Sequence, residues 1–388
     1  MKQTTLILLT LLLLLSNACL PIPPTTLPVT PTLTLTPPSF PSETSTSTAT
    51  ASLTESSTPT ETDTPSATAT SSATPTDTMT STATETSTPA PEPISIPALE
   101  DWDAGSMAFS QGAEGEWDHI LWGGFANSLV KKGDTYYLYY QGSQFYDDTC
   151  ESVAHRAIGV ATSTDGIHWT KSPRNPVLTW TSQGSIEEGA VGSAVWVGAD
   201  GRFYLYYGAN TGTGCNIRAN LRLAVSEDGE SFEDAGEVLS ANDQDVWGSG
   251  DEFHPVGAYS NENQWYLYYI PNGVSLARKL GVAIGGSPAS FEQSTGLNDS
   301  TVPAWGPVSV VLRGAESVLV TNPEGVDGPL NFYRFDAANP ASVQLQGSYN
   351  IPDCTQASVL YEHDTGRWMI SCRGQVADHY TIRNAYTP

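Results

Sequence analysis

Positive charge is scarce in this sequence. Its 388 residues include 16 Lys and Arg but 42 Asp and Glu, which gives a formal net charge of −26 at pH 7. The part from residue 99 onward carries 35 acidic and 15 basic residues, a net charge of −20. Nucleic acids and anionic lipid surfaces bind cationic protein surfaces, so this composition excludes both as partners of the folded part.

Long apolar runs and metal-binding motifs are also missing. The N-terminal apolar segment, residues 6–15, is too short to cross a bilayer as a helix, which takes about 20 residues. The five cysteines form no CxxC motif, and His is neither frequent nor clustered. We therefore expect no metal site and no cofactor, with a structural calcium ion left open.

The N-terminus has the form of a secretory signal. Lys2 precedes the apolar segment, which ends shortly before Ser16-Asn17-Ala18-Cys19. This ending resembles a bacterial lipoprotein signal, in which the Cys is lipidated and becomes the new N-terminus. We predict a signal peptide over residues 1–19 and an extracellular protein anchored to the membrane only by a lipid on Cys19. The alternative is ordinary cleavage nearby, with no role for Cys19.

Aromatic residues are almost absent from residues 20–98. Ser, Thr and Pro account for 53 of the 78 residues at positions 21–98, and Phe40 is the one aromatic. Such a segment buries too little apolar area to offset its conformational entropy, so we predict a disordered stalk. All 10 Trp and all 17 Tyr lie in residues 99–388, which we predict to be one folded, monomeric domain.

That domain contains a repeated phrase. Residues 128–140 (SLVKKGDTYYLYY) read as strand, tight turn and strand, and they recur at 193–207 and 256–269, with weaker copies at 308–320 and 358–371. The first three copies have a downstream companion, such as 158–169 (IGVATSTDGIHW), that predicts a third and a fourth strand. Five units of four antiparallel strands predict an all-β, five-bladed β-propeller after the disordered stalk.

The phrasing resembles the five-bladed propellers of glycoside hydrolase families 43, 32, 62 and 130. The resemblance rests on YYLYY at 136–140, on the companion at 158–169 and on NPVL at 175–178. It implies a carbohydrate substrate, an Asp base in blade one, an Asp that orients the acid in blade two, and a Glu acid in blade three. A six-bladed sialidase-like propeller is the competing fold.

The innermost strands of a propeller line its central funnel, so the residues just before each repeated strand should converge on one site. Carboxylates there can act as acid and base, and Trp faces can stack on sugar rings. The predicted catalytic residues are Glu252, Glu188, Asp251 and Asp118. The predicted substrate-binding residues are Trp117, Trp122, Asn127, Trp247, His254 and Trp305.

Other interpretations of these residues remain open. Asp118 could be a solvated loop acid, Trp117, Trp122 and Trp247 could be packing residues, and His254 could be structural. Asp165 and Asp228 stand in Asp-Gly turns, so we predict that both are structural. The resemblance puts its blade-one Asp at Ala126-Asn127, where none is present. The sequence thus predicts a surface-anchored glycosidase, with a non-catalytic carbohydrate-binding propeller as the alternative.

Two further predictions concern the ends of the domain and its cysteines. The last unit is one strand short, and residues 105–110 can supply that strand and close the ring. Cys354 and Cys372 flank the hairpin of the fifth unit, and Cys150 and Cys215 follow equivalent strands of neighbouring units. We therefore predict the disulfides Cys354–Cys372 and Cys150–Cys215.

Overall fold

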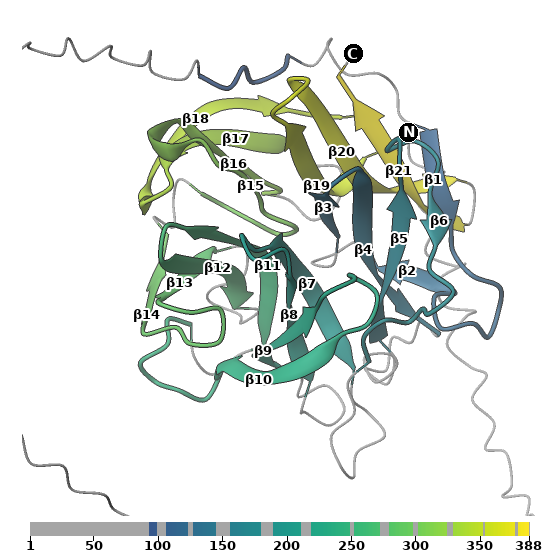
Figure 1. Ribbon diagram of the computed structural model, residues 1–388, viewed down its shortest axis with the longest axis horizontal. Helices are drawn as coiled ribbons and strands as arrows, with labels where there is room; N and C mark the ends of the chain where they lie inside the picture. The colour runs from purple at the N-terminus through teal and green to yellow at the C-terminus, as the bar shows by residue number, and fades with distance from the viewer. Residues whose placement is uncertain are drawn as a thin grey trace, which may run out of the picture. The chain divides into compact units, whose positions relative to one another are not determined.

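Strands dominate the structure, as the repeats predict (Figure 1). The computed structural model describes residues 93–98, 106–122, 127–144, 156–179, 189–210, 219–248, 252–271, 279–297, 302–323, 329–351, 354–376 and 379–387. These residues contain no α-helix, and a short 3₁₀ helix, η3 (Gly314–Glu316), connects two strands. None of their helices is long and apolar enough to span a membrane.

The strands form five antiparallel sheets. The first contains β2 (Ile120–Trp122), β3 (Ser128–Lys132), β4 (Thr135–Ser143), β5 (Arg156–Ser163) and β6 (Thr170–Lys171). The second contains β7 (Ala190–Val197), β8 (Phe203–Asn210), β9 (Ala219–Ser226) and β10 (Glu233–Leu239). The third contains β11 (Phe253–Asn261), β12 (Gln264–Pro271), β13 (Gly281–Gly285) and β14 (Gln293–Gly296). The fourth contains β15 (Ser309–Val311), β16 (Ser317–Thr321), β17 (Leu330–Asp336) and β18 (Asn339–Tyr349). The fifth contains β19 (Thr355–Glu362), β20 (Arg367–Val376), β21 (His379–Tyr386) and β1 (Ser106–Ser110).

The all-β class and the propeller-like arrangement of antiparallel sheets are confirmed. Four sheets have four strands, but the prediction of four strands is wrong for the first sheet, which has five. The reason is the length of β4, whose nine residues exceed the five of β3. The last residues of β4 extend beyond β3, so on that side their backbone N–H and C=O groups would have no partner strand. Strand β2 pairs with them instead, in the register Ile120 to Ser143 and Trp122 to Gln141.

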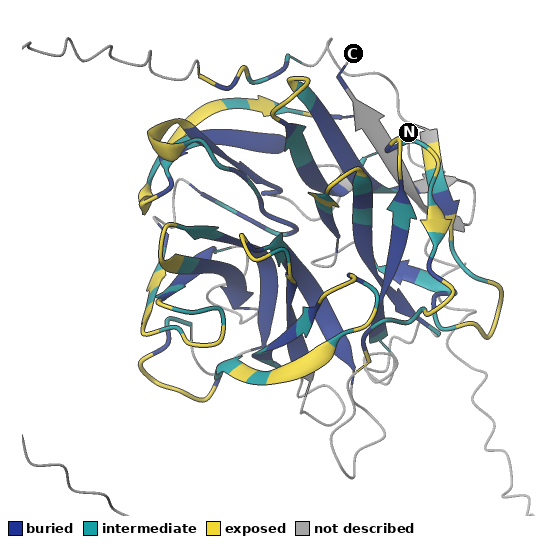
Figure 2. Ribbon diagram, in the orientation of Figure 1, coloured by how far each residue is buried: buried dark blue, intermediate teal, exposed yellow. Residues whose placement is uncertain are grey.

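The first repeated strand of each unit lies innermost. β3, β7, β11, β15 and β19 neighbour one another in a ring, in that order and back to β3. Burial follows this order, because β7 and β11 are mostly buried whereas β10 and β18 are largely exposed (Figure 2). The burial gradient explains why the first two strands of each repeat are the most apolar and aromatic part of the sequence.

Serine hydroxyls join the inner strands of neighbouring sheets. The Oγ atoms of Ser128, Ser309 and Ser358 accept hydrogen bonds from the backbone N–H groups of Val195 (3.0 Å), Val359 (2.7 Å) and Leu129 (3.0 Å). These buried N–H groups have no ladder partner, so an unmade hydrogen bond would destabilise the fold. In four of the five repeats a serine stands directly before the apolar residues of the inner strand. These serines are Ser128, Ser193, Ser309 and Ser358.

In the third repeat a glycine, and not a serine, allows the inner strand to contact its neighbour. A Cβ at Gly257 would lie 2.4 Å from the carbonyl oxygen of Val308, so only glycine permits this approach. The backbones then contact each other directly, and the N–H of Val308 donates to the carbonyl of Val256 at 2.7 Å.

The hydrophobic core consists of clusters that each join two successive sheets. One packs Tyr139 of the first sheet against Leu205 of the second, and another packs Tyr206 of the second against Leu267 of the third. Further clusters join the third sheet to the fourth and the fourth to the fifth. The last cluster joins the fifth sheet to the first through Phe109, Leu138 and Met369. The packing therefore runs around the whole ring.

Strand β1 closes the ring, as predicted. It pairs with β21 in the register Ser106 to Asn384 and Ser110 to Thr381. Residues 93–98, which the composition assigns to the stalk, also contact this region. Ile94 is fully buried, and the indole N–H of Trp368 donates to the carbonyl of Ser95 at 2.9 Å. This segment satisfies a buried indole donor that would otherwise have no acceptor.

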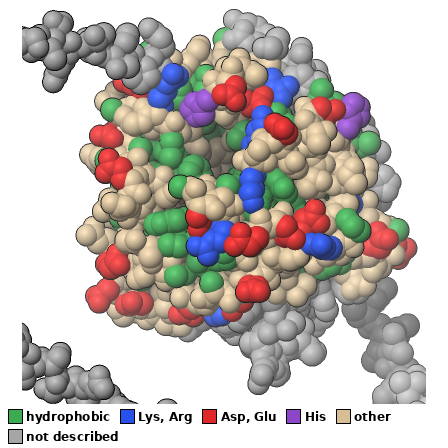
Figure 3. Space-filling view, in the orientation of Figure 1, with side chains coloured by type: hydrophobic (Ala, Val, Ile, Leu, Met, Phe, Trp, Pro, Cys, Tyr) green, Lys and Arg blue, Asp and Glu red, His purple; other side chains and the backbone are tan. Residues whose placement is uncertain are grey.

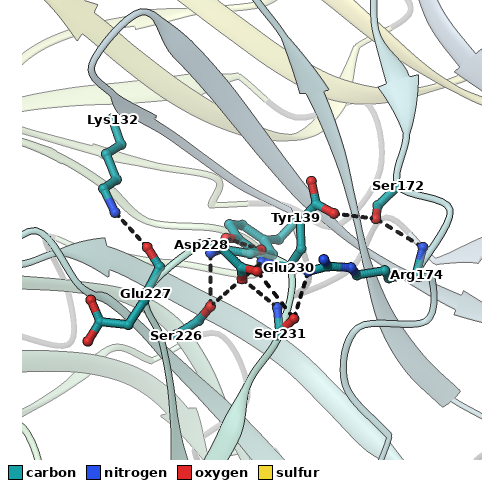
Figure 4. A network of polar contacts seen from close by, with 10 residues as sticks. Lys132, Tyr139, Ser172, Arg174, Ser226, Glu227, Asp228, Glu230 and Ser231 are labelled. Carbon is teal, nitrogen blue, oxygen red and sulfur yellow. Dashed lines mark hydrogen bonds and ion pairs between the residues drawn. The ribbon is translucent and has the colours of Figure 1, made fainter.

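The Asp-Gly turns are structural, as predicted. In the first sheet, Asp165 accepts the backbone N–H groups of Ile167 and His168. In the second, Asp228 accepts those of Glu230 and Ser231 (Figure 4).

The turn of the second sheet also ties that sheet to the first. Arg174 donates to Asp228 at 2.7 Å, Ser172 donates to Glu230 at 2.9 Å, and Lys132 donates to the carbonyl of Glu227 at 2.7 Å (Figure 4). Burial alone would raise the pKa of Asp228, but the backbone N–H groups and Arg174 outweigh it and hold that pKa below its usual range.

The disulfide Cys354–Cys372 is present, and its Cα atoms lie 5.4 Å apart across the β19–β20 hairpin. The predicted partners Cys150 and Cys215 lie outside the described residues. Replacing Cys354 and Cys372 together with Ser should lower the free energy of unfolding by about 2–4 kcal/mol, because the bridge restricts the unfolded chain. Urea denaturation measures this loss, and an unchanged midpoint would contradict it.

A buried carboxylate network reinforces the contact between the fifth sheet and the first. Glu362 accepts Lys131 Nζ at 2.5 Å, Arg367 Nε at 2.7 Å and the hydroxyl of Tyr136. Burial alone would raise the pKa of Glu362, but the hydrogen bonds from Lys131, Tyr136 and Arg367 outweigh it and lower that pKa from 4.5 to about 2. The charged form of Glu362 is therefore much more stable in the folded protein than in the unfolded chain.

This network predicts a specific pH dependence. A depressed folded-state pKa contributes stability that is complete above the unfolded value of 4.5 and is lost as the pH falls toward about 2. The contribution is on the order of 3 kcal/mol. Wild type should therefore lose stability between pH 5 and pH 2.5, and Glu362→Gln should flatten that part of the profile. Urea denaturation at stepped pH measures both, with the exposed Glu233→Gln as control, and parallel profiles would contradict the assignment.

Candidate functional site

Buried polar side chains gather where the inner strands begin. Asn127 is 0% exposed, His254 2%, Glu252 5% and Gln356 7%. They stand at the starts of β3, β11 and β19, and ring order brings β3 next to β19. Polar groups this deeply buried are unusual unless they serve a network or a ligand. This end of the ring is the candidate functional site, and we call it the strand-start end.

Glu252 and His254 form a pair at the start of β11. His254 Nε2 lies 3.2 Å from Glu252 Oε2, and both side chains are almost fully buried. The alternation of a strand puts residues two apart on the same face, which explains why Glu-x-His at this position forms a contact. A carboxyl within reach of an imidazole is suited to holding and transferring a proton.

A guanidinium lies beside this pair. Arg156, the first residue of β5, lies over the ring of Trp122 with 4.4 Å between the guanidinium carbon and the ring centroid. Burial lowers the pKa of Arg156, and the negative charge of Glu252 opposes that shift only in part. The strand-start end therefore combines a carboxyl, an imidazole, a half-buried cation and an indole from the first and third sheets.

Amide side chains complete the site on the side of the fifth sheet. Asn127 Nδ2 donates to the carbonyl of Gln356 at 3.3 Å. The side-chain oxygens of both residues are buried without a hydrogen-bond donor among the described residues. Gln356 also has a φ of 54°, a left-handed conformation that costs free energy for a residue other than glycine. Unsatisfied acceptors in a strained segment are typical of positions that bind a ligand.

Asn322 holds this segment in place. It accepts the N–H of Ala357 at 2.8 Å and donates to the carbonyls of Ala357 and Pro307 at 2.9 and 2.6 Å. Its own carbonyl accepts the N–H of Trp305 at 2.5 Å, which places the backbone of that predicted substrate-binding residue next to the same segment. A contact of the Trp305 side chain with sugar stays a prediction.

Asp118 has a partner of its own. Its Oδ2 accepts Lys171 Nζ at 2.6 Å, and the hydroxyl of Tyr140 lies 3.4 Å away, all within the first sheet and its entry loop. The pairing with Lys171, 53 residues later, gives Asp118 a structural task that the sequence did not indicate. Its catalytic role stays a prediction.

Trp117 and Trp247 pack in the same way in two different sheets. A Cβ at Gly142 or Gly159 would lie 2.6 or 2.5 Å from the ring of Trp117. Gly281 and Gly296 meet Trp247 in the same manner, at 2.8 and 2.5 Å. Each indole also lies against the last Tyr of its YLYY phrase, Tyr140 or Tyr269. These contacts favour the packing interpretation of both residues, and sugar binding by either stays a prediction.

Three of the predicted site residues cannot be placed in this site. Glu188, Asp251 and the lipidation residue Cys19 lie outside the described residues. Among the described residues, no group of three His, Cys, Asp or Glu is arranged to hold a metal ion.

Arg156, Gln141 and Asn322 are not among the site residues that the sequence predicts. Gln141 is buried and its side-chain oxygen accepts the N–H of Gly192 at 2.9 Å, which ties the first sheet to the second at the strand-start end. The predicted residues all precede inner strands, whereas Arg156 begins a third strand and Gln141 and Asn322 lie at the ends of second strands. One signal was available, because a polar residue directly follows an apolar second strand in both Tyr140-Gln141 and Thr321-Asn322.

A cavity of about 440 Å³ lies along the inner strands, mostly toward the opposite end of the ring, and it reaches Ser128 and Ser309 at the strand starts. Its walls combine aliphatic residues such as Leu129, Val195 and Val310 with polar and charged ones such as Lys131 and Glu362. Figure 3 shows a hollow near the middle of the face, with hydrophobic side chains around it. Lys131 and Glu362 bind each other there, and Asp134, His363 and Asp364 also line the cavity.

Comparisons with known proteins agree with the fold. No protein-family model and no curated protein matches this sequence. Among solved structures, Zg3597, a family 117 glycoside hydrolase of the marine bacterium Zobellia galactanivorans, is similar with a TM-score of 0.53 and 16% identity over 74% of this chain and 89% of its own. BT0996, solved as an RGII complex, is similar with a TM-score of 0.50 and 14% identity over 73% and 90%. The Bombyx mori family 32 β-fructofuranosidase BmSUC1 is similar with a TM-score of 0.50 and 13% identity over 71% and 61%.

Proposed function

We propose that this protein is a glycosidase that hydrolyses an extracellular oligo- or polysaccharide, with Glu252 as the general acid. The buried Glu252–His254 pair at the start of an inner strand carries the proposal. Its support is the propeller fold, whose solved structural neighbours include glycoside hydrolases. Because these neighbours are less than 25% identical to this chain, they support the fold, and the proposed chemistry depends on this chain's own residues.

The geometry suits an acid that protonates a leaving group. Such an acid must hold its proton near neutral pH, and burial away from water favours the uncharged form of a carboxyl. Glu252 is buried in this way, and His254 Nε2 lies 3.2 Å from its Oε2, close enough to influence the carboxyl. Glu252 would then donate its proton to the glycosidic oxygen as the bond to the sugar breaks.

A second carboxylate must activate water or attack the sugar. The two groups stand about 6.5–9.5 Å apart in inverting enzymes and about 5–5.5 Å apart in retaining ones. Asp118 is held by Lys171, so Glu188 and Asp251 are the stronger candidates for this role. A specific observation also favours the alternative of a binding propeller without catalysis. At the start of the first inner strand, the buried polar group is the amide of Asn127 rather than a carboxylate.

The test is turnover on a panel of oligosaccharides, with new reducing ends detected by mass spectrometry. We expect at least one glycan to be cleaved by wild type and by the exposed control variant Glu233→Gln. Binding of a glycan without any cleavage across the panel would instead establish the capture function.

We also propose that the protein is exported and anchored at the cell surface through Cys19, with the Ser/Thr/Pro-rich residues that precede Ile94 as a spacer. The proposal rests on the apolar segment and on Ala18-Cys19. In a bacterium that processes lipoproteins, wild type should partition with membranes, and Cys19→Ser should shift the protein to the soluble fraction. Fractionation followed by immunoblotting measures the shift, and unchanged membrane association of the variant would rule out the lipid anchor.

A further inference from the structure

The proposed site contains a cation without a counterion. Arg156 forms no ion pair and no side-chain hydrogen bond with any described residue, and its Nε is completely buried. Several other arginines do have acidic partners, such as Asp228 for Arg174, Asp234 for Arg222 and Glu362 for Arg367. Arg156 as a whole is half-buried, so its guanidinium can be reached by a ligand while no described residue binds it as a counterion.

Glu252 is one candidate for that partner, because its charge acts on Arg156. The two residues form no ion pair with each other. The proposed acid form of Glu252 is also uncharged, so in that form the carboxyl offers Arg156 no compensating charge.

We propose that Arg156 binds the anionic group of an acidic glycan, a uronate carboxylate or a sulfate ester, and so sets the substrate class of this site. The inference rests on the proposed function for the location of the sugar. A planar guanidinium has parallel N–H donors that match the two oxygens of such a group. The ring of Trp122, with its centroid 4.4 Å from the guanidinium carbon, packs against the guanidinium on one side.

The rest of the site fits this assignment. The side-chain oxygens of Asn127 and Gln356, buried without donors among the described residues, can accept hydroxyl groups of the same sugar. The domain as a whole is strongly acidic, so its long-range field does not attract anions. Affinity for an acidic glycan would therefore come from Arg156 itself, and changing that residue should remove the preference.

The test compares acidic oligosaccharides with matched neutral ones. Full-length protein is titrated by calorimetry with oligogalacturonate, oligomannuronate and hyaluronan tetrasaccharides, with their carboxyl-reduced forms and with a sulfated galactose tetrasaccharide. We expect one acidic ligand to bind on the order of 10–100-fold more tightly than its neutral counterpart, because a charged hydrogen-bonded pair contributes about 1.5–3 kcal/mol. Arg156→Gln should abolish this preference, Arg156→Lys should restore part of it, and Arg174→Gln should leave it intact.

The outcomes separate this inference from the proposed glycosidase activity. Tight binding of an acidic glycan without cleavage would support the role of Arg156 and overturn catalysis. Cleavage of neutral and acidic glycans with equal Kd would support catalysis and overturn the role of Arg156. If Arg156→Gln fails to fold, as judged by circular dichroism, the comparison of acidic and carboxyl-reduced ligands on wild type still decides. Preference for the sulfated ligand would identify sulfate rather than carboxylate as the bound group.

Discussion

Deleting residues 99–111, which include β1, should abolish cooperative unfolding of the domain. β1 is the fourth strand of the fifth sheet, and its loss would leave β21 as an open edge next to the first sheet. The deletion also removes Phe109, which packs against Tyr140 with 4.8 Å between ring centroids and belongs to the cluster that joins the fifth sheet to the first. Because every sheet packs on two neighbours, opening one contact weakens the whole ring.

Thermal melting followed by circular dichroism measures this effect. The matched control is deletion of residues 60–72, the same number of residues from the Ser/Thr/Pro-rich part, which should leave Tm unchanged. An equal Tm for the 99–111 deletion would contradict ring closure by β1.

Glu252→Gln should lower kcat by on the order of 10²–10⁴, the usual contribution of one general acid, while Kd for the glycan stays within a few-fold of wild type. The amide keeps the size of the carboxyl and its acceptor oxygen, but it has no proton to give to a leaving group. Kinetics on the cleaved glycan and calorimetry on the same ligand separate the two effects. The exposed Glu233→Gln is the control, and full activity of Glu252→Gln would assign the acid to another carboxyl.

The repeats made much of this fold predictable. Alternating apolar and aromatic residues around Gly and Asp turns are local signals, so the inner hairpins followed directly from the sequence. The closure by β1 could be inferred too, because the fifth unit lacked one strand. Strand β2 could not be inferred from the sequence, since Ile120–Trp122 is only three residues long and forms a strand because β4 extends beyond β3.

The site was harder to predict because its contacts depend on distant pairings. Glu252 and His254 lie on one face of one strand, so their contact follows from spacing. The ion pair of Asp118 with Lys171 and the packing of Trp117 on Gly142 and Gly159 required the sheet register, which the sequence does not reveal. Arg156 reaches Trp122 only because β5 and β2 both pair with β4. The sequence around a charged residue at a strand end does not show which distant residue it will contact.

The central claim is that function resides at the strand-start end of the ring and not in the cavity at its opposite end. The most direct test is a crystal structure of the Glu252→Gln variant with a bound oligosaccharide. We predict that a glycosidic oxygen lies within hydrogen-bonding distance, about 3 Å, of the side chain at position 252, with Arg156 and Trp122 in contact with the same ligand. A sugar bound instead among Lys131, Trp196 and Val310, with the strand-start end free of ligand, would contradict the account.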